Sequence, residues 1–305
     1  MIASAETFTV FDPQASTIGR TDRVTLEITT RCNLKCVMCP HGLPEGLPGQ
    51  SDASDMLIGE VIRYFDKTRI LQPTGVGEPL LSAGFWKIVD ALAGRTNPML
   101  MFVTNGILLT KPNVERLTQA PLFQVNVSLD AARPDTHLRI RGNDLAKSLA
   151  GVRNLTDMRA RTGADFLIRF AFVIMRENVE EAPAIVEMAH SLGANAVYFE
   201  HMVTLVTDPK AWNVKRGNWL FNYAENELRG DAAASDPWIL KAMDRADALG
   251  IRIDGSGILL EPGLEALQDS RPCRLDPGAR VSFEERTRRI GLSVSEAAKG
   301  APDVA

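Results

Sequence analysis

Short hydrophobic runs alternate along the chain with longer segments in which hydrophobic residues recur every three or four positions. The short runs predict strands, and the longer periodic segments predict helices between them. The predicted strands are 24–29, 70–74, 100–104, 123–130, 166–175 and 196–201. The predicted helices lie near 55–66, 84–93, 112–119, 144–161 and 179–192. This alternation predicts βα units that build a parallel sheet.

The predicted strand at 123–130 decides between two arrangements of such a sheet, because its side chains alternate between hydrophobic and polar. A parallel strand with helices on both faces is hydrophobic on both sides. The polar positions are Gln124, Asn126, Ser128 and Asp130, and Thr25, Glu27 and Thr29 repeat the pattern on the first strand. A polar side indicates the solvated interior of an incompletely filled barrel. The predicted fold class is therefore α/β, a partial (β/α)6 TIM-like barrel with a short irregular C-terminal extension.

Three segments are expected along the chain. They are an N-terminal arm (1–22), the partial barrel (23–225) and the C-terminal extension (226–305). Residues 205–235 contain tryptophan and asparagine without a regular pattern and are predicted to be irregular. In the extension, a helix at about 237–249 and a strand at 251–253 precede a tail that is expected to be weakly ordered.

The composition of the 305 residues, 45% hydrophobic and 24% charged, is that of an ordinary globular protein. A formal net charge of −4 argues against nucleic acid or an anionic membrane surface as the main partner. No apolar run reaches the roughly 18–20 residues that a bilayer crossing needs, and residues 1–20 lack the pattern of a signal peptide. We therefore expect a cytoplasmic protein with neither nucleic-acid nor membrane partners.

Three of the four cysteines, Cys32, Cys36 and Cys39, fall within eight residues, whereas Cys273 is far away. A disulfide framework needs dispersed pairs, so the crowded thiols indicate a metal site. A zinc-stabilised binding module would need a fourth ligand, and the nearby His41 follows Cys39 too closely to reach the same tetrahedron easily. Thiolates also suit iron–sulfur clusters. Three thiolates on a four-iron cluster would leave one iron open to a substrate.

This spacing, just after the first predicted strand, resembles the signature of the radical S-adenosylmethionine (SAM) superfamily. Asn33 and Leu34 also match, and Met38 occupies the usually large apolar position before the third cysteine. The resemblance implies a [4Fe–4S] cluster on the three cysteines, whose open iron binds the amino and carboxylate groups of SAM. It also implies reductive cleavage of SAM to a 5′-deoxyadenosyl radical, an electron donor such as flavodoxin or ferredoxin, and cofactor contacts from Met38.

A second match follows the second predicted strand. Gly77, Glu78 and Pro79 resemble the family's Gly-Gly-Glu-Pro motif, although Val76 replaces its first glycine. The resemblance implies that these three residues bind the amino group of SAM, and a buried carboxylate would accept such a charge-assisted hydrogen bond. A dinucleotide-binding fingerprint is the competing interpretation. It fails because Leu80 stands at the third glycine position and Pro79 interrupts the turn.

Weaker matches end the next two predicted strands. Asn105 lies in a Thr-Asn-Gly triplet that family members often carry, but the same triplet also suits a plain turn. Ser128 and Asp130 resemble the family's Ser-x-Asp-Gly, with Ala131 in place of glycine. The resemblance implies that Ser128 contacts the ribose or the methionine part of SAM, and Asp130 is included in the cofactor site.

Four further residues have possible functional roles. Arg141 and Arg169 are candidates to bind the cofactor carboxylate, although Arg141 could lie on the surface and Arg169 could extend its head group to solvent. Glu200 and His201 end the sixth predicted strand and could perform acid–base work on a substrate. A structural pair is the alternative interpretation of these two residues.

Residues 271–274, which include Cys273, resemble the start of the SPASM or twitch extensions that hold auxiliary clusters. No cysteine follows, so the extension is interpreted as truncated and without a complete second cluster. We predict a radical SAM enzyme that abstracts a hydrogen atom from a small molecule such as a sugar or a natural-product precursor. The alternatives are a maturase of ribosomal peptides, a chain that binds a cluster without catalysing a reaction, and the zinc module.

Overall fold

The computed structural model describes residues 21–43, 46–47, 49–203, 209–255 and 257–261. Its central element is a seven-stranded sheet in the order β1-β2-β3-β4-β5-β6-β9, in which every pair of neighbours is parallel. The strands are β1 (Thr21–Glu27), β2 (Thr68–Thr74), β3 (Met99–Thr104), β4 (Leu122–Ser128), β5 (Leu167–Ile174), β6 (Ala196–His201) and β9 (Arg252–Asp254). Because β1 and β9 do not pair with each other, the sheet is open.

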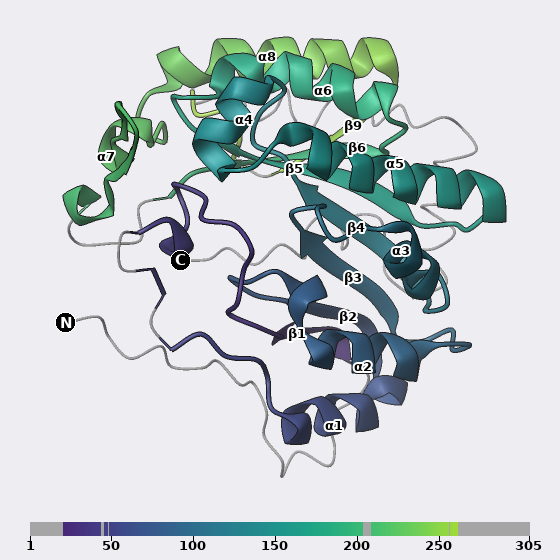
Figure 1. The fold of residues 1–305 in the computed structure, drawn as a ribbon. Coiled ribbons are helices and arrows are strands. Elements are labelled where there is room, and N and C mark those ends of the chain that lie inside the picture. The colour runs from purple at the N-terminus through teal and green to yellow at the C-terminus, as the bar shows by residue number, and fades with distance from the viewer. Residues whose placement is uncertain (1–20, 44–45, 48, 204–208, 256, 262–305) are drawn as a thin grey trace.

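A single layer of helices covers one face of this sheet, and successive helices lie side by side (Figure 1). The helices of this layer are α1 (Asp55–Arg63), α2 (Ala83–Leu92), α3 (Lys111–Leu117), α5 (Leu145–Thr162), α6 (Ala182–Ser191) and α8 (Ala232–Leu249). Two shorter helices are α4 (Pro134–Arg141), which follows the carboxyl end of β4, and α7 (Tyr223–Asn226). The main hydrophobic core lies between the helix layer and the sheet.

This arrangement confirms the predicted α/β partial barrel. The six βα units lie in chain order, and a seventh parallel strand, β9, pairs with β6. The strand β9 and the helix α8 come from residues that the sequence assigned to the C-terminal extension, and α8 packs against α6. The boundary at residue 225 stays a prediction.

Helix boundaries follow from local chemistry. The side chain of Asp144 accepts a hydrogen bond from the amide of Ala146 at the start of α5, and Gly163 ends this helix in the left-handed conformation. The helix α8 has the same two signals, an aspartate at Asp231 and a left-handed glycine at Gly250. These caps satisfy backbone groups that helix ends leave without partners.

Two regions differ from the sequence expectations. The helix α4 was not predicted, because it is short and polar, although Pro134 and Gly142 are ordinary start and stop signals. Part of the segment expected to be irregular forms an antiparallel hairpin of β7 (Val214–Arg216) and β8 (Trp219–Phe221). The Gly-Asn pair between these strands is a turn signal that could have revealed the hairpin.

The polar side of β4 is largely paired within the protein. Gln124 and Asn126 are buried, and the Nε2 of Gln124 donates to the Oδ1 of Asn126 at 2.7 Å. The same oxygen accepts from the Nε of Arg169 at 2.8 Å. Thr25 and Glu27 on the same face of the sheet are exposed. The inner side of β4 is therefore polar as expected, but buried hydrophobic residues also lie there, such as Met101, whose sulfur is 3.7 Å from the Nε2 of Gln124. Solvent reaches only part of this face.

In the described ranges, no helix is both long enough and apolar enough to cross a membrane.

Candidate active site

The three clustered cysteines lie on one loop, residues 29–43, which follows β1 and is called the cysteine loop below. Cys36 is buried, Cys32 and Cys39 are half-buried, and all three thiols are free. The amide of Leu34 donates to the sulfur of Cys32 at 3.4 Å, and the amide of Cys39 donates to the carbonyl of Cys36 at 3.1 Å. The loop thus presents three thiols from a compact, hydrogen-bonded backbone.

Gly42 allows the loop to turn back on itself. A Cβ at this position would overlap the carbonyl group of Cys36. The amide of Gly42 donates to the carbonyl of Cys39 at 2.8 Å, which closes the short 3-10 turn Pro40–Gly42. The spacing of the second and third cysteines therefore depends on a residue without a side chain at position 42.

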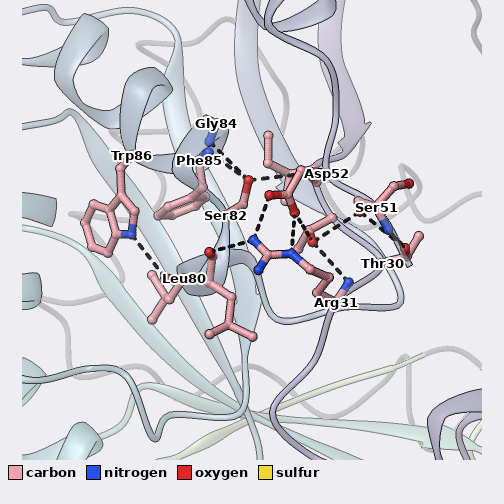
Figure 2. Close-up of polar contacts among 12 residues, drawn as sticks. Thr30, Arg31, Ser51, Asp52, Leu80, Ser82, Gly84, Phe85 and Trp86 are labelled. Carbon is pink, nitrogen blue, oxygen red and sulfur yellow. Dashed lines mark hydrogen bonds and ion pairs between the residues drawn. The ribbon is translucent and has the colours of Figure 1, made fainter. Parts of the chain in front are cut away.

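The start of the cysteine loop is fixed by Asp52 (Figure 2). Arg31, the residue before Cys32, donates to the Asp52 carboxylate from Nε at 3.0 Å and from Nη2 at 2.6 Å. Its Nη2 also donates to the carbonyl of Leu81 at 3.1 Å, and the hydroxyl of Thr29 donates to Asp52 at 2.6 Å. The Asp52 carboxylate holds the pKa of Arg31 above its ordinary value. These contacts tie the residue before the first cysteine to Asp52, which precedes α1, and to Leu81, which follows β2.

The turn after β2 lies against the cysteine loop. The amide of Gly77 donates to the carbonyl of Thr29 at 3.2 Å, and the amide of Glu78 donates to the carbonyl of Arg31 at 2.8 Å. A Cβ on Gly77 would overlap both of these carbonyl oxygens. Pro79, which is buried, begins the 3-10 turn Pro79–Leu81. The structure therefore brings the Gly-Glu-Pro motif directly to the cysteines.

Glu78 is 2% exposed, and its carboxylate is held by three donors. One oxygen accepts from the hydroxyl of Thr104 at 2.7 Å and from the amide of Leu80 at 3.3 Å, and the other accepts from the amide of Asn105 at 2.8 Å. Burial raises the pKa of Glu78, and these hydrogen bonds oppose the rise. Because a carboxylate has about four acceptor sites, roughly one remains for a ligand.

Asn105 links this carboxylate to the cysteine loop. Its backbone amide donates to Glu78, and its side-chain Nδ2 donates to the Oδ1 of Asn33 at 2.7 Å. Asn33 lies next to Cys32, so the end of β3 supports the first cysteine. The structure thus joins the Thr-Asn-Gly triplet to the other motifs through side-chain contacts.

Arg141 and Asp130 form a buried ion pair beside the second cysteine. The other oxygen of Asp130 accepts from the amide of Val173 at 2.8 Å, so the pair joins β4, α4 and β5. The sulfur of Cys36 lies 3.9 Å from the carbonyl of Arg141. The Nε of Arg141 is buried and has no hydrogen-bond partner in the described part of the chain. The guanidinium therefore keeps one donor available for a ligand.

Met38 and Ser128 occupy two further positions in this region. Met38 is half-buried and packs against a hydrophobic cluster that includes Ile140 and Met175. Ser128 is half-buried at the end of β4, on the same face of the strand as Asn126. Both residues lie at the carboxyl end of the sheet.

Arg169 does not lie at this end. It is the third residue of β5 and precedes Val173 by four positions, or about 13 Å along a strand. Its Nη1 donates to Asp254 at 3.1 Å, and its guanidinium stacks over the ring of Tyr198 with a distance of 4.6 Å to the ring centroid. Arg169 thus belongs to the polar network on the inner face, away from the cysteine loop.

Glu200 and His201 do not form a pair, because adjacent residues on β6 face opposite sides of the sheet. Glu200 reaches solvent on the inner side, and partial desolvation of its carboxylate by the surrounding protein raises its pKa. The Nε2 of His201 lies 3.1 Å from the carbonyl of Ile258, and burial lowers the pKa of His201. Cys273 lies outside the described residues.

The donor set fits an iron–sulfur cluster better than one metal ion. In the described residues, no group of three or more His, Cys, Asp or Glu side chains converges to hold a single ion, and His41 completes no such group. Burial raises the pKa of all three thiols, that of Cys39 to about 11. Buried thiols become stable thiolates only when a positive group binds them. A cluster, which spaces its thiolates more widely than a zinc ion does, would supply that charge.

Comparison with known proteins supports the same interpretation. A family model of the radical SAM superfamily matches residues 26–189, more than half of the chain. The AdoMet-dependent heme synthase of Methanosarcina barkeri is 30% identical over 184 residues, which cover 58% of this chain and 49% of that protein. A GTP 3',8-cyclase of Rhodopseudomonas palustris is 31% identical over 206 residues, which cover 64% of this chain and 57% of that protein. The chain spans about half the length of these relatives.

Solved structures share the fold. The crystal structure of Streptococcus suis SuiB bound to S-adenosylmethionine superposes with a TM-score of 0.59 and 14% identity, covering 80% of this chain and 53% of that one. At this identity the likeness concerns the fold. The shared fold agrees with the family match and with the three free thiols on one loop. The chain belongs to the radical SAM superfamily, whose cofactors are a [4Fe–4S] cluster and S-adenosylmethionine.

Proposed function

We propose that this protein is a radical SAM enzyme that removes a hydrogen atom from a polar small molecule, such as a sugar or a natural-product precursor. The observation that carries the proposal is the grouping of three free thiols on one loop that β2, β3 and α4 hold in place. When bound there, the reduced cluster supplies the electron that cleaves SAM to methionine and a 5′-deoxyadenosyl radical.

In this proposal Cys32, Cys36 and Cys39 hold the cluster, and the surrounding chain fixes their spacing. Arg31, next to the first thiol, is held by Asp52 and by the carbonyl of Leu81 after β2. Gly42 lets the loop pack closely against the carbonyl of Cys36. Both contacts are made by the protein alone, so the loop keeps its shape before a cluster binds. A preorganised loop lowers the conformational entropy that cluster binding has to overcome.

The residues around the cysteines are proposed to hold SAM. Gly77, Glu78 and Pro79 would bind the amino group, for which the remaining acceptor site of the Glu78 carboxylate is suited. Arg141 is the stronger candidate for the carboxylate of SAM, because its buried Nε lacks a partner in the described residues. Arg169 is the weaker one, since it is engaged with Asn126 and Asp254. Met38, Asn105, Ser128 and Asp130 would complete the site.

The polar inner face of the sheet supports a small polar substrate. Thr25, Glu27 and Glu200 are exposed on this face, and Tyr198 is half-buried among them. Two of the relatives, those described above, are named for heme synthesis and for the cyclisation of GTP, both reactions of small molecules, whereas another of 30% identity is named mycofactocin maturase. SuiB has also been solved with the precursor peptide SuiA, so peptides remain the alternative substrate class. An electron donor such as flavodoxin or ferredoxin is proposed as partner.

The first test is anaerobic reconstitution with iron and sulfide, followed by dithionite and SAM. The wild type should release 5′-deoxyadenosine and methionine in equal amounts, measured by liquid chromatography with mass spectrometry. Variants with Cys32→Ala, Cys36→Ala or Cys39→Ala should release neither. An intact iron–sulfur chromophore that yields no 5′-deoxyadenosine would support the non-catalytic alternative, and zinc without sulfide would support the binding module.

A second experiment separates the two substrate classes. Extract from the source cells is divided by ultrafiltration into a metabolite fraction and a peptide fraction, and each is added to the reduced enzyme. The proposal expects faster 5′-deoxyadenosine release with the metabolite fraction only. Faster release with the peptide fraction alone would contradict it.

A further inference from the structure

Three backbone carbonyl groups from two separate segments meet around the guanidinium of Arg216, which lies on the β7–β8 hairpin. We propose that Arg216 is a positioning residue for the cysteine loop, holding the backbone next to Cys36 against the end of α4. The inference rests on the proposed function only in treating Cys36 as a cluster ligand. The contacts themselves are properties of the protein without its cofactors.

The hydrogen bonds of Arg216 join elements that are distant in sequence. Its Nη1 donates to the carbonyl of Leu138 at 3.1 Å and to that of Arg139 at 2.7 Å, while its Nη2 donates to the carbonyl of Lys35. Leu138 and Arg139 belong to the last turn of α4. The carbonyl of Leu138 also accepts from the amide of Gly142 at 3.0 Å, whereas carbonyl groups at a helix end generally need partners from outside the helix. One planar guanidinium thus caps a helix and holds the residue before Cys36.

A second contact holds the same stretch of the loop to α4. The amide of Val37 donates to the carbonyl of Ile140 at 2.9 Å. Val37 is 1% exposed and packs in one cluster with Ile140, Val214 and Phe221. Both neighbours of Cys36 are therefore fixed, one by Arg216 and one by α4. Val214 and Phe221 belong to the hairpin, so the hairpin packs in the same cluster as Val37.

Gly142 leaves the space that Arg216 occupies. A Cβ at this position would lie 3.0 Å from both Nη atoms of Arg216, which is closer than ordinary van der Waals contact. Gly142 also ends α4 in the left-handed conformation, with φ of 80°. Substitution at position 142 would therefore displace the guanidinium without removing it, which provides an independent way to test the contact.

The hairpin gives Arg216 a firm base. Arg216 pairs with Trp219 across the Gly-Asn turn, and Trp219 and Phe221 stack in a tilted arrangement with ring centroids 5.9 Å apart. Phe221 in turn contacts Tyr223 edge to face. The aromatic residues restrict the hairpin, so the guanidinium is oriented by its strand as well as by its three acceptors.

A positive group at this place has an electrostatic consequence as well as a structural one. Burial lowers the pKa of Arg216, and the proximity of Cys36 opposes this shift. Nearby charge and hydrogen bonding tune the reduction potential of iron–sulfur clusters. A guanidinium near a cluster ligand favours the more negative, reduced state. A purely structural support of the hairpin would leave the potential unchanged when its charge is removed.

The test compares Arg216→Gln and Arg216→Lys with the matched control Lys215→Gln, which alters the exposed neighbour on the same strand. In the protein without cofactors, Arg216→Gln should increase amide hydrogen exchange at residues 35–39 at least tenfold and leave α5 and α6 unchanged. Arg216→Lys should restore part of the protection. Lys215→Gln should match the wild type.

The reconstituted protein supplies the second measurement. Arg216→Gln should lose iron to a chelator at least tenfold faster, and the midpoint potential of its remaining cluster should be more negative. Wild-type exchange at residues 35–39 together with a wild-type potential in Arg216→Gln would overturn the proposal. If Arg216→Gln does not fold, Gly142→Ala replaces it, and unchanged exchange in that variant overturns the proposal equally.

The two proposals fail in different ways. Exchange at residues 35–39 is measured without iron, so it reports on Arg216 whether or not the three cysteines hold a cluster. A wild-type protein that binds no iron–sulfur cluster but shows the Arg216 effect would refute the proposed function and keep this inference.

Discussion

The carboxylate of Glu78 and the hydroxyl of Thr104 lie 2.7 Å apart, so a residue of the Gly-Glu-Pro motif also holds the end of β3. A change at Glu78 therefore combines two effects. It removes a candidate ligand of SAM, and it leaves the buried amide of Asn105 without its acceptor. Thr104→Val separates the two effects because it removes one supporting hydrogen bond and keeps the carboxylate.

Glu78→Ala should lower the free energy of unfolding by about 1–3 kcal/mol, because buried donors lose their acceptor. It should also weaken SAM binding tenfold or more, about 1.4 kcal/mol, measured by electron paramagnetic resonance titration of the reconstituted cluster. Thr104→Val should lose stability and keep most of its affinity. Unchanged affinity in Glu78→Ala would remove Glu78 from the proposed SAM site.

Metal analysis tests the cysteine loop. The reconstituted protein should hold about four irons and four sulfides, as expected for one [4Fe–4S] cluster. Alanine at Cys32, Cys36 or Cys39 should abolish the brown chromophore, whereas Cys273→Ala should keep it. About eight irons in the wild type would contradict a single cluster.

The ion pair between Asp130 and Arg141 should contribute strongly to stability because both side chains are buried. Asp130→Asn removes the negative charge and leaves the guanidinium buried without a counter-charge, which should cost about 3 kcal/mol in urea unfolding. The control is Asp135→Asn, which alters an exposed carboxylate bonded to Arg139 on the same helix. That change should stay within about 0.5 kcal/mol. Equal losses would show that burial does not decide the effect.

Gly77 should tolerate no side chain, because a Cβ there would overlap the carbonyl oxygens of Thr29 and Arg31. Gly77→Ala should displace the cysteine loop and lower the iron content after reconstitution. Gly59→Ala is the matched control, since nothing lies within 4 Å of a Cβ at that position in α1. This control should gain about 0.5–1 kcal/mol of stability and bind iron normally. Normal iron content in Gly77→Ala would contradict the close approach.

His137 should make stability depend on pH. It is fully buried, its Nε2 lies 3.1 Å from the Oδ1 of Asn143, and its Nδ1 lacks a hydrogen-bond partner among the described residues. Burial is the main cause that lowers its pKa to about 4, and the nearby Arg141 adds to it. The His137 imidazole therefore becomes protonated near pH 6.5 in the unfolded chain, but only near pH 4 in the folded protein.

Stability from this histidine is complete above pH 6.5 and is lost as the pH falls towards 4, by about 3 kcal/mol in total. His137→Gln should remove this part of the pH dependence, which urea unfolding at several pH values measures. Carboxylates titrate in the same window, so the difference between the variant and the wild type is the informative quantity. Parallel curves for the two proteins would contradict a buried neutral histidine.

The sequence predicted the first six strands of the sheet, because short hydrophobic runs alternate there with segments of helical periodicity. It also placed Glu78 and the three cysteines at the carboxyl ends of their strands, where short-range motifs are sufficient. It did not predict that Asn33 accepts a hydrogen bond from Asn105 or that Thr104 donates one to Glu78. These contacts join residues that are 72 and 26 positions apart.

Arg141 and Arg169 show the limit of sequence reasoning. Arg169 lies within a predicted strand and Arg141 lies between predicted elements, but neither position indicates which side chain meets the cofactor. The helix α4 turns Arg141 towards Asp130, whereas the strand position of Arg169 turns it towards Asp254. The role of Arg216 could not be predicted, because it depends on a hairpin whose turn signal is two residues long and on carbonyl groups of distant segments.

The pairing of β9 with β6 determines how much of the chain is needed for autonomous folding. Asp254 is the carboxylate that neutralises Arg169, whose side chain is only 21% exposed. A fragment ending at residue 225 would leave that guanidinium without its ion-pair partner and would uncover the surface of α6 on which α8 packs. A fragment that folds independently should therefore include β9 and the buried residues Ile258 and Leu259 that follow it, and a fragment ending at residue 225 should be recovered as aggregates.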